Sequence, residues 1–374
     1  MPRPTKLALT TVLAASGALA LATAGAAAAA PAGGALFVQN DNPAGNAVTV
    51  YDRGPDGALT QAGTYATGGR GRALTGSVVD HLASQDSLAY DGPDRLLFAV
   101  NAGSDTISAF AVAGDRLSLR QVVGSGGAVP VSLAVHGDLV YVLNALAGGS
   151  VAGYRIEDRH LVAIPGSNRP LGLAPDATPQ FTSTPGDVAF TPDGRDLLVT
   201  TKAGGNSVDV FAVEAGGLLA SAPVVNAEPG AVPFAIAFDP AGHVDVAEAG
   251  TNTVASFELG AAGTLAPLSA VATGQAATCW LAADGSLLFA GNAGSGDEST
   301  ISASAGGALS LLATTPTDAG TVDAVASPDG RFLYVQTGKA GIVDAFRVGD
   351  GGALTAIGSV TVPDGAGGEG IAAS

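Results

Sequence analysis

The chain has 374 residues, with 33 acidic and 16 basic side chains and a formal net charge of −17 at pH 7. Such an acidic surface argues against nucleic acid and anionic membranes as partners. Cys279 is the single cysteine, so no intrachain disulfide can stabilise the fold. The 54 glycines and the low charge content are typical of an all-β protein with many tight turns.

The first thirty residues predict an export signal. Arg3 and Lys6 precede an apolar and small-residue run from position 7 to about 30, followed by Pro31. This order is that of a secretory signal peptide, 1–30, cleaved within 24–32. A membrane anchor is the alternative, but the run is mostly alanine. Cleavage leaves 14 cations against 33 carboxylates and a net charge of −19. The protein is therefore expected to be secreted and extracellular, or associated with the cell envelope, with no membrane contact after cleavage.

A unit of turn, strand, loop, strand and turn recurs in residues 31–374, which show no linker or break in composition. The strand before each loop repeats as LFVQN, LFAVN, VYVLN and LFAGN, and each unit ends in a turn followed by leucine. These leucines, 44 to 58 residues apart, are Leu59, Leu117, Leu161, Leu219, Leu265, Leu309 and Leu354. Four short strands per unit of 40–45 residues predict an all-β, seven-bladed β-propeller.

The two ends of the chain predict how the ring closes. The first copy begins at Ala35 with the second strand of a blade, and the C-terminal residues 368–373 resemble the innermost strands elsewhere. We therefore expect the C-terminal strand to complete blade one, which removes an open sheet edge. The approximate blades are 35–65 with 366–374, 85–123, 128–167, 184–225, 231–271, 275–315 and 320–361.

The repeated LYV-x-N/T, PDGR and GGAL patterns resemble the seven-bladed lactonase family, which includes 6-phosphogluconolactonases and 3-carboxymuconate cyclases. The segments 130–144, 233–250 and 276–295 resemble its exported branch with YVTN-type repeats. This resemblance implies an enzyme that opens or forms a lactone. It also implies a closely spaced histidine pair before an innermost strand. Positions 130–132, 185–187 and 233–235 read PVS, PGD and PFA instead, so that pair is missing.

Two long crossovers, 66–86 and 167–184, identify the face of the propeller that is expected to carry the function. The first contains Arg70, Arg72 and His81, and the second contains Arg169. We predict that both crossovers overhang the channel mouth and form a concave binding site lined by Trp280. The other three histidines, at 136, 160 and 243, are expected in turns on the opposite face.

One register of the innermost strands places a ring of side chains at the channel mouth. Its members are Ser87, Ser132, Asp187, Ala235, Trp280, Asp323 and Gly370, with Gln85 close by. The ring is interpreted as a water-filled mouth, as packing, or as a polar binding pocket that includes Gln85 and Ser132. In the third case Trp280 is a stacking wall and Asp187 or Asp323 is the catalytic base, because neighbouring carboxylates raise each other's pKa.

Neither a Gly-rich phosphate loop nor a Cys/His metal pattern occurs, so we expect no cofactor and no metal. Acidic residues outnumber cations on the expected functional face, which argues against a sugar phosphate substrate. Two functions stay open. One is a lactonase or carboxymuconate cyclase-like enzyme, with a lactone or related acid as its small-molecule partner. The other is a non-catalytic extracellular module that binds a glycan or protein.

Overall fold

The computed structural model describes residues 1, 2, 4 and 33–374, and the segment Gly33–Ser374 forms one compact unit. Nearly all of the predicted signal peptide lies outside the described residues. No helix among the described residues is long and apolar enough to cross a membrane.

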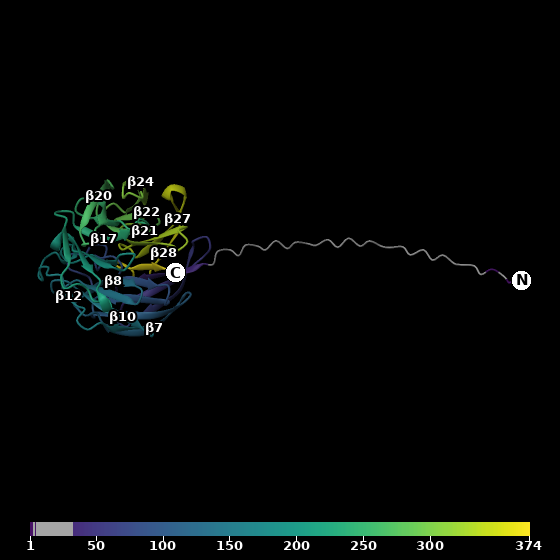
Figure 1. Ribbon diagram of the computed structural model, residues 1–374, viewed down its shortest axis with the longest axis horizontal. Coiled ribbons are helices and arrows are strands. Elements are labelled where there is room, and N and C mark those ends of the chain that lie inside the picture. The colour runs from purple at the N-terminus through teal and green to yellow at the C-terminus, as the bar shows by residue number, and fades with distance from the viewer. Residues whose placement is uncertain (3, 5–32) are drawn as a thin grey trace. The chain divides into compact units, whose positions relative to one another are not determined.

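The described residues form seven antiparallel sheets arranged as blades around a ring (Figure 1). Blade one contains β29 (Ile371–Ala373), β1 (Gly34–Gln39), β2 (Ala47–Arg53) and β3 (Leu59–Ala66). Blade two contains β4 (Leu88–Asp91), β5 (Leu96–Asn101), β6 (Thr106–Ala113) and β7 (Arg116–Gly124). Blade three contains β8 (Pro130–His136), β9 (Leu139–Asn144), β10 (Ser150–Glu157) and β11 (His160–Ala163), with the short β12 (Arg169–Pro170) paired to β10.

The remaining four blades follow in chain order. Blade four contains β13 (Asp187–Phe190), β14 (Asp196–Thr200), β15 (Ser207–Ala212) and β16 (Val224–Ala227). Blade five contains β17 (Pro233–Phe238), β18 (Val244–Glu248), β19 (Thr253–Leu259) and β20 (Leu265–Ala272). Blade six contains β21 (Thr278–Asp284), β22 (Leu287–Asn292), β23 (Asp297–Ala303) and β24 (Leu309–Pro316). Blade seven contains β25 (Thr321–Ala326), β26 (Phe332–Thr337), β27 (Ile342–Val348) and β28 (Leu354–Thr361).

Helical structure in the described chain is limited to short turns. These are α1 (Gln180–Ser183), α2 (Lys202–Gly205), and the 3₁₀ turns η1 (Ala215–Gly217) and η2 (Asp350–Gly352). The predicted seven-bladed propeller is therefore confirmed.

The predicted closure of the ring is also confirmed. Strand β29 pairs antiparallel with β1, with Leu36 opposite Ala373. Backbone and side-chain hydrogen bonds extend this pairing, from Ala35 N to Ser374 Oγ at 3.0 Å and from Gln39 N to the Gly370 carbonyl at 2.9 Å. The yellow C-terminal end accordingly lies beside the purple strands of blade one in Figure 1. Blade one is shared by the two ends of the propeller.

Large side chains at one position of each second strand fill the spaces between blades. Six blades carry a buried large hydrophobic residue there: Phe37, Phe98, Tyr141, Leu198, Phe289 and Tyr334. Blade five carries Asp245 instead, fully buried, and neither of its carboxyl oxygens has a hydrogen-bond partner. Burial raises the pKa of Asp245 to about 7. The core of blade five therefore contains a carboxyl group where the repeat has an aromatic or aliphatic side chain.

A second exception occurs in the third strand of blade six. The other six blades place a buried aliphatic residue at this position: Val48, Ile107, Val151, Val208, Val254 and Val343. Blade six has Glu298, fully buried, with both carboxyl oxygens unpartnered. Burial, with the nearby Asp297 and Asp323, raises its pKa well above the usual value, so the neutral form is favoured.

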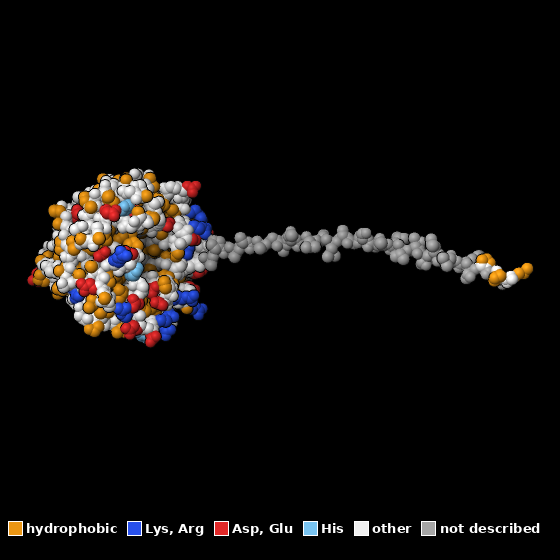
Figure 2. Space-filling view, viewed as in Figure 1, with side chains coloured by type: hydrophobic (Ala, Val, Ile, Leu, Met, Phe, Trp, Pro, Cys, Tyr) orange, Lys and Arg blue, Asp and Glu red, His pale blue; other side chains and the backbone are white. Residues whose placement is uncertain are grey.

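Figure 2 shows hydrophobic side chains scattered among polar ones on one face, with charged side chains along its lower and right-hand margins. Among the most exposed large hydrophobic residues are Val225, Leu268 and Leu312, on the outer strands β16, β20 and β24. Single exposed side chains of this kind are normal on a soluble surface. The largely apolar concave surface in the described residues is the cavity described first below.

Candidate functional site

Residues 80–86, here called the plug, close the central channel. Asp86 O accepts a hydrogen bond from Leu133 N of blade three, and Gln85 N donates to Gly186 O of blade four. Ser84 O accepts from the Trp280 indole of blade six at 2.7 Å. The first crossover thus enters the channel and bonds to several blades. The sequence predicted that it would overhang the mouth.

Two cavities adjoin the plug, one on each side. The upper cavity, on the face with the crossovers, has a volume of 480 Å³ and includes Asp80 and Ala83 of the plug. The lower cavity, with a volume of 520 Å³, includes Asp86 and runs along the innermost strands. Both volumes are in the range of sites for small organic ligands.

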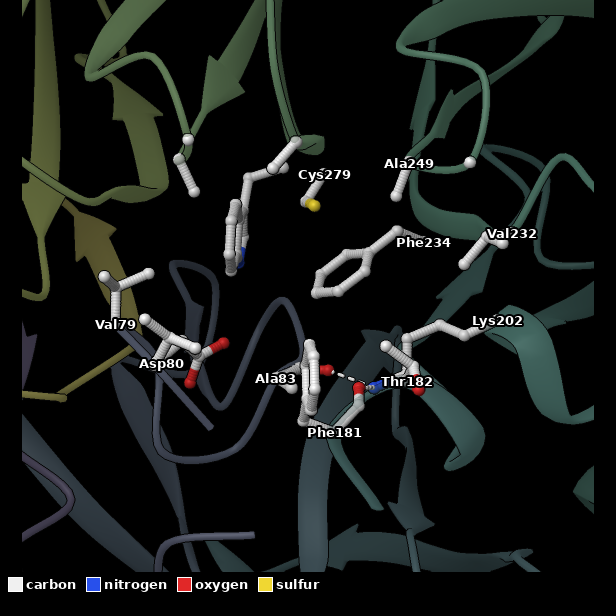
Figure 3. A pocket seen from close by; sticks show the side chains of 16 residues that line it. Val79, Asp80, Ala83, Phe181, Thr182, Lys202, Val232, Phe234, Ala249 and Cys279 are labelled. Carbon is white, nitrogen blue, oxygen red and sulfur yellow. Dashed lines mark hydrogen bonds between the residues drawn. The ribbon is translucent and has the colours of Figure 1, made fainter. Parts of the chain in front are cut away.

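The upper cavity is enclosed by parts of both crossovers and by loops of blades four to six (Figure 3). Its walls are mainly apolar, and the residues that carry the argument below are Asp80, Phe181, Lys202, Phe234, Cys279 and Trp280. The rings of Phe234 and Trp280 are 4.9 Å apart and form one wall. The structure therefore brings parts of both crossovers and Trp280 to one cavity.

Lys202 is the fully buried cation of this site. Its Nζ donates to Ala83 O at 2.5 Å, to Phe181 O at 2.7 Å and to Thr184 Oγ1 at 3.3 Å, and it lies 5.2 Å from the centre of the Phe234 ring. A neutral amine has only two protons, so three acceptors favour the charged form. Burial lowers the pKa of Lys202 to about 7, and the nearby Asp80 acts in the opposite direction. One ammonium group thus connects the two crossovers to blade four.

Asp80 is the buried carboxylate of the upper cavity. Its Oδ1 accepts from Leu82 N at 2.7 Å and its Oδ2 accepts from Ser84 N at 2.9 Å. Each oxygen keeps a further lone pair for a ligand or a water molecule. Burial raises the pKa of Asp80 to about 6, although the backbone donors and Lys202 lower it. The group can therefore exchange a proton near neutral pH.

Cys279 lies beside Phe234 in the wall of the upper cavity (Figure 3). Burial raises the pKa of its thiol to about 12, and Lys202 offsets this only in part. The thiolate is the reactive form of cysteine. Cys279 is therefore an apolar wall residue.

Of the residues predicted to bind a ligand, Trp280 is the one that lines the upper cavity. The Gln85 side chain is occupied by Leu281, donating to its carbonyl at 3.0 Å and accepting from its N–H at 2.8 Å. His81 is half-buried beside Gly367 and the Asp41 backbone, and burial lowers its pKa. Ser132 Oγ donates to Asp187 at 3.1 Å.

The three predicted arginines do not converge. Arg70 and Arg72 are exposed, and neither is among the described residues that line the cavity. The Arg169 guanidinium donates to the backbone carbonyls of Leu219 and Ala220, next to blade four. An anionic ligand in the upper cavity would therefore meet none of these guanidinium groups.

The two predicted catalytic aspartates lie deep among the innermost strands. Asp187 accepts from Ser132 Oγ and from Ile236 N at 2.9 Å, and Asp323 accepts from Ile371 N at 3.2 Å. Burial and the charge of Asp86 raise the pKa of each well above its usual value. Neither aspartate is among the described residues that line the two cavities. Their catalytic role stays a prediction.

Sequence reasoning did not identify Asp80, Phe181 or Lys202 as site residues. Lys202 has a φ of 46°, which is uncommon for a residue other than glycine, and it follows the second strand of blade four where other repeats have Gly-containing loops. Its position two residues after a second strand was the available signal, but the exposed Lys339 of blade seven shares that position, so the sequence does not distinguish the two. No group of three or more His, Cys, Asp or Glu side chains in the described part of the chain could hold a metal ion.

Comparison with protein families identifies the class that this closed propeller belongs to. Residues 73–365 match the model of the family described as lactonase, 7-bladed beta-propeller. The chain therefore belongs to the seven-bladed lactonase family. A search of curated proteins found no match.

Solved structures with the same fold cover nearly the whole propeller. A putative 6-phosphogluconolactonase from Bacteroides fragilis is 19% identical with a TM-score of 0.72, covering 93% of this chain and 99% of its own. A protein from Lactobacillus plantarum is 20% identical with a TM-score of 0.73, and the coverage is 91% and 99%. The periplasmic gluconolactonase of Pseudomonas aeruginosa is 20% identical with a TM-score of 0.71 and the same coverage. At these identities the likeness is one of fold.

Proposed function

We propose that this chain is an exported lactonase that hydrolyses a small, largely apolar lactone in the upper cavity. Family membership supports a small-molecule substrate, and the sequence of residues 1–30 supports export. The observation that carries the proposal is the composition of the cavity: aromatic and aliphatic walls around the Asp80 carboxylate and the buried Lys202. Apolar walls favour a ring with a hydrocarbon substituent over a sugar phosphate.

Asp80 is the general base of the proposed reaction. A water molecule attacks the lactone carbonyl carbon while Asp80 accepts one of its protons through a free lone pair. The ring C–O bond then breaks, and the protonated Asp80 returns the proton to the departing oxygen, which gives a hydroxy acid. A carboxyl pKa of about 6 suits both transfers near neutral pH.

Lys202 is the proposed stabiliser of the negative charge that develops on the carbonyl oxygen. Its contact to Thr184 Oγ1, at 3.3 Å, is the longest of its three hydrogen bonds. Turning that one proton toward the oxyanion costs less than breaking either contact to a backbone carbonyl. Placing the cation in a buried site strengthens its effect on the transition state.

A non-catalytic binding module is the second candidate. The observation in its favour is that all three ammonium protons of Lys202 already have acceptors, so an oxyanion must compete for one of them. The predicted extracellular partner would then occupy the same cavity without being turned over. Glycans and proteins fit this small apolar space less well than a small ring compound.

The decisive experiment measures acid release from a δ-lactone with an alkyl side chain and from glucono-δ-lactone. We expect turnover of the alkyl lactone, a loss of about 100-fold or more in Asp80→Asn, and no effect of EDTA. Asp187→Asn and Asp323→Asn are the matched comparisons, because both aspartates are buried outside the cavity. If Asp187→Asn and Asp323→Asn lost activity while Asp80→Asn kept it, the general base would be one of the aspartates of the innermost strands. Saturable binding of the alkyl lactone without hydrolysis would identify a binding module.

A further inference from the structure

The lower cavity is a second concave space, open to solvent, that the proposed lactonase reaction does not use. It is formed by the lower halves of six innermost strands, β4, β8, β13, β17, β25 and β29. Aliphatic side chains such as Leu133, Val188 and Ile371 alternate along it with Tyr90 and Phe190. The plug closes its upper end, so the space is blind on that side.

Asp86 is the charged group of the lower cavity, and it lies at the closed end. Its backbone is fixed by the hydrogen bond from Leu133 N to its carbonyl at 2.8 Å. Its φ of 60° lies in the left-handed region. The nearby Gln85 amide, whose hydrogen bonds go to Leu281, lowers the pKa of the Asp86 carboxyl, and burial raises it. The other carboxyls of the ring, by contrast, accept backbone N–H groups.

Charge in the lower cavity is of one sign. The described residues that line it include no lysine or arginine, and His136 is its one histidine. Around the closed end, Asp187 and Asp323 have raised pKa values that favour their neutral forms, whereas burial raises the pKa of Asp86 only to about 6. Asp86 is therefore the carboxyl at this end whose ionised form is least disfavoured.

We propose that the lower cavity binds a small organic monocation, an amine or quaternary ammonium compound with an apolar body, whose charge lies against the Asp86 carboxylate. The aliphatic and aromatic walls would cover the body of the ligand, and the single carboxylate would pair with its charge. A buried carboxylate with one amide neighbour gains most from an ionic partner.

Other ligand classes fit the lower cavity less well. A divalent metal needs several oxygen or nitrogen ligands, and the described residues contain no suitable group of three. An anion would be repelled by Asp86. A neutral apolar compound would leave the carboxylate unpaired in a space from which the ligand excludes water.

The test is a calorimetric titration of the purified protein at pH 7 with 2-phenylethylammonium and with its neutral analogue, 2-phenylethanol. We expect the ammonium to bind and the alcohol to bind at least about tenfold more weakly. Asp86→Asn should weaken ammonium binding by a similar factor. Asparagine tolerates positive φ, so this variant keeps the plug conformation. Asp94→Asn, at an exposed turn of the same blade, is the matched control and should bind like the original chain.

A second variant tests the location without touching Asp86. Ala134→Phe adds a ring inside the cavity and should abolish ammonium binding while the lactone turnover of the upper cavity continues. Equal binding of the ammonium and the alcohol would overturn the proposal, and so would undiminished binding in Asp86→Asn or Ala134→Phe. The proposal would also be overturned if potassium or calcium chloride bound and the ammonium compound did not. The same holds if neither organic compound bound.

Discussion

The two cavities differ in how they use their charged group. In the upper cavity the Lys202 ammonium has three oxygen acceptors and holds two crossovers in place. In the lower cavity the Asp86 carboxylate has the Gln85 amide nearby, and it interacts with the carboxyls of Asp187 and Asp323. A charge whose hydrogen bonds are all made within the protein stabilises structure and must give up one of them to act on a ligand, whereas a charge left without such partners is available to a ligand directly. The seven residues of the plug place Asp80 in the upper cavity and Asp86 in the lower one. One short segment therefore supplies a carboxyl group to both cavities.

The largest expected effect comes from removing the closure that both cavities share. Deleting residues 363–374 removes β29 from blade one, the Ile371 wall of the lower cavity, and the Gly367 carbonyl that accepts from His81 N of the plug. We expect a loss of more than about 4 kcal/mol in unfolding free energy, measured by denaturant titration, because a strand ladder and buried side chains disappear. A truncated chain that unfolds at the same denaturant concentration would show that neither cavity depends on closure.

A smaller effect should separate the cavities. Lys202→Met leaves the carbonyls of Ala83 and Phe181 without their donor, at a cost of about 3 kcal/mol. We expect faster proteolysis of the segment 167–184 and loss of alkyl lactone binding. Ammonium binding in the lower cavity should continue, since Leu133, Gly186 and Trp280 still hold the plug. Lys339→Met, at an exposed loop, is the control. Simultaneous loss of both ligands would contradict the separation of the two charges.

The smallest expected effect is the change of folding stability with pH. Burial raises the pKa of Asp41 to about 8, of Asp245 to about 7, and of Asp80 and Asp86 to about 6. A folded pKa above the unfolded one means that the folded chain binds more protons. The resulting stability is fully present below about pH 4, the unfolded pKa, and is lost as pH rises through 6 to 8. The melting temperature should therefore rise from pH 7 to pH 5.

Asp245→Asn isolates one part of this pH dependence. The variant should flatten the profile by roughly 2 to 3 kcal/mol between pH 5 and pH 8, because its amide does not titrate. Asp52→Asn, at an exposed position, should leave the profile unchanged. A profile that falls toward pH 5 in the original chain would mean that the buried carboxyls are ionised when folded.

The sequence predicted the fold because the propeller repeats its own pattern. Seven leucines after turns gave the blade number, and the likeness of residues 368–373 to inner strands gave the closure. Asp245 and Glu298 were also visible in principle, since each interrupts a column of hydrophobic residues in the repeats. Aligning the repeats position by position would have identified both.

The upper cavity could be predicted only in outline. Trp280 and the two crossovers were identified, but the three acceptors of Lys202 lie 119, 21 and 18 residues away from it. Two of them are backbone carbonyls, which any residue supplies, so no side-chain pattern reveals them. The plug bonds to Val131, Gly186 and Leu133 largely through backbone groups as well. Contacts of this kind depend on the backbone path of a loop, which cannot be predicted from its residue types.

The shared blade also determines when folding of the propeller can be completed. Ala35 and Ser374 are hydrogen-bonded across 339 positions, so their pairing must wait until the whole chain has been made. At ordinary rates of synthesis that delay is roughly 20 to 70 s, during which β1 has no inner partner. Contacts between such distant residues also close slowly. A chain that cannot close its ring before synthesis ends stays incompletely folded for longer, which is compatible with the export proposed above.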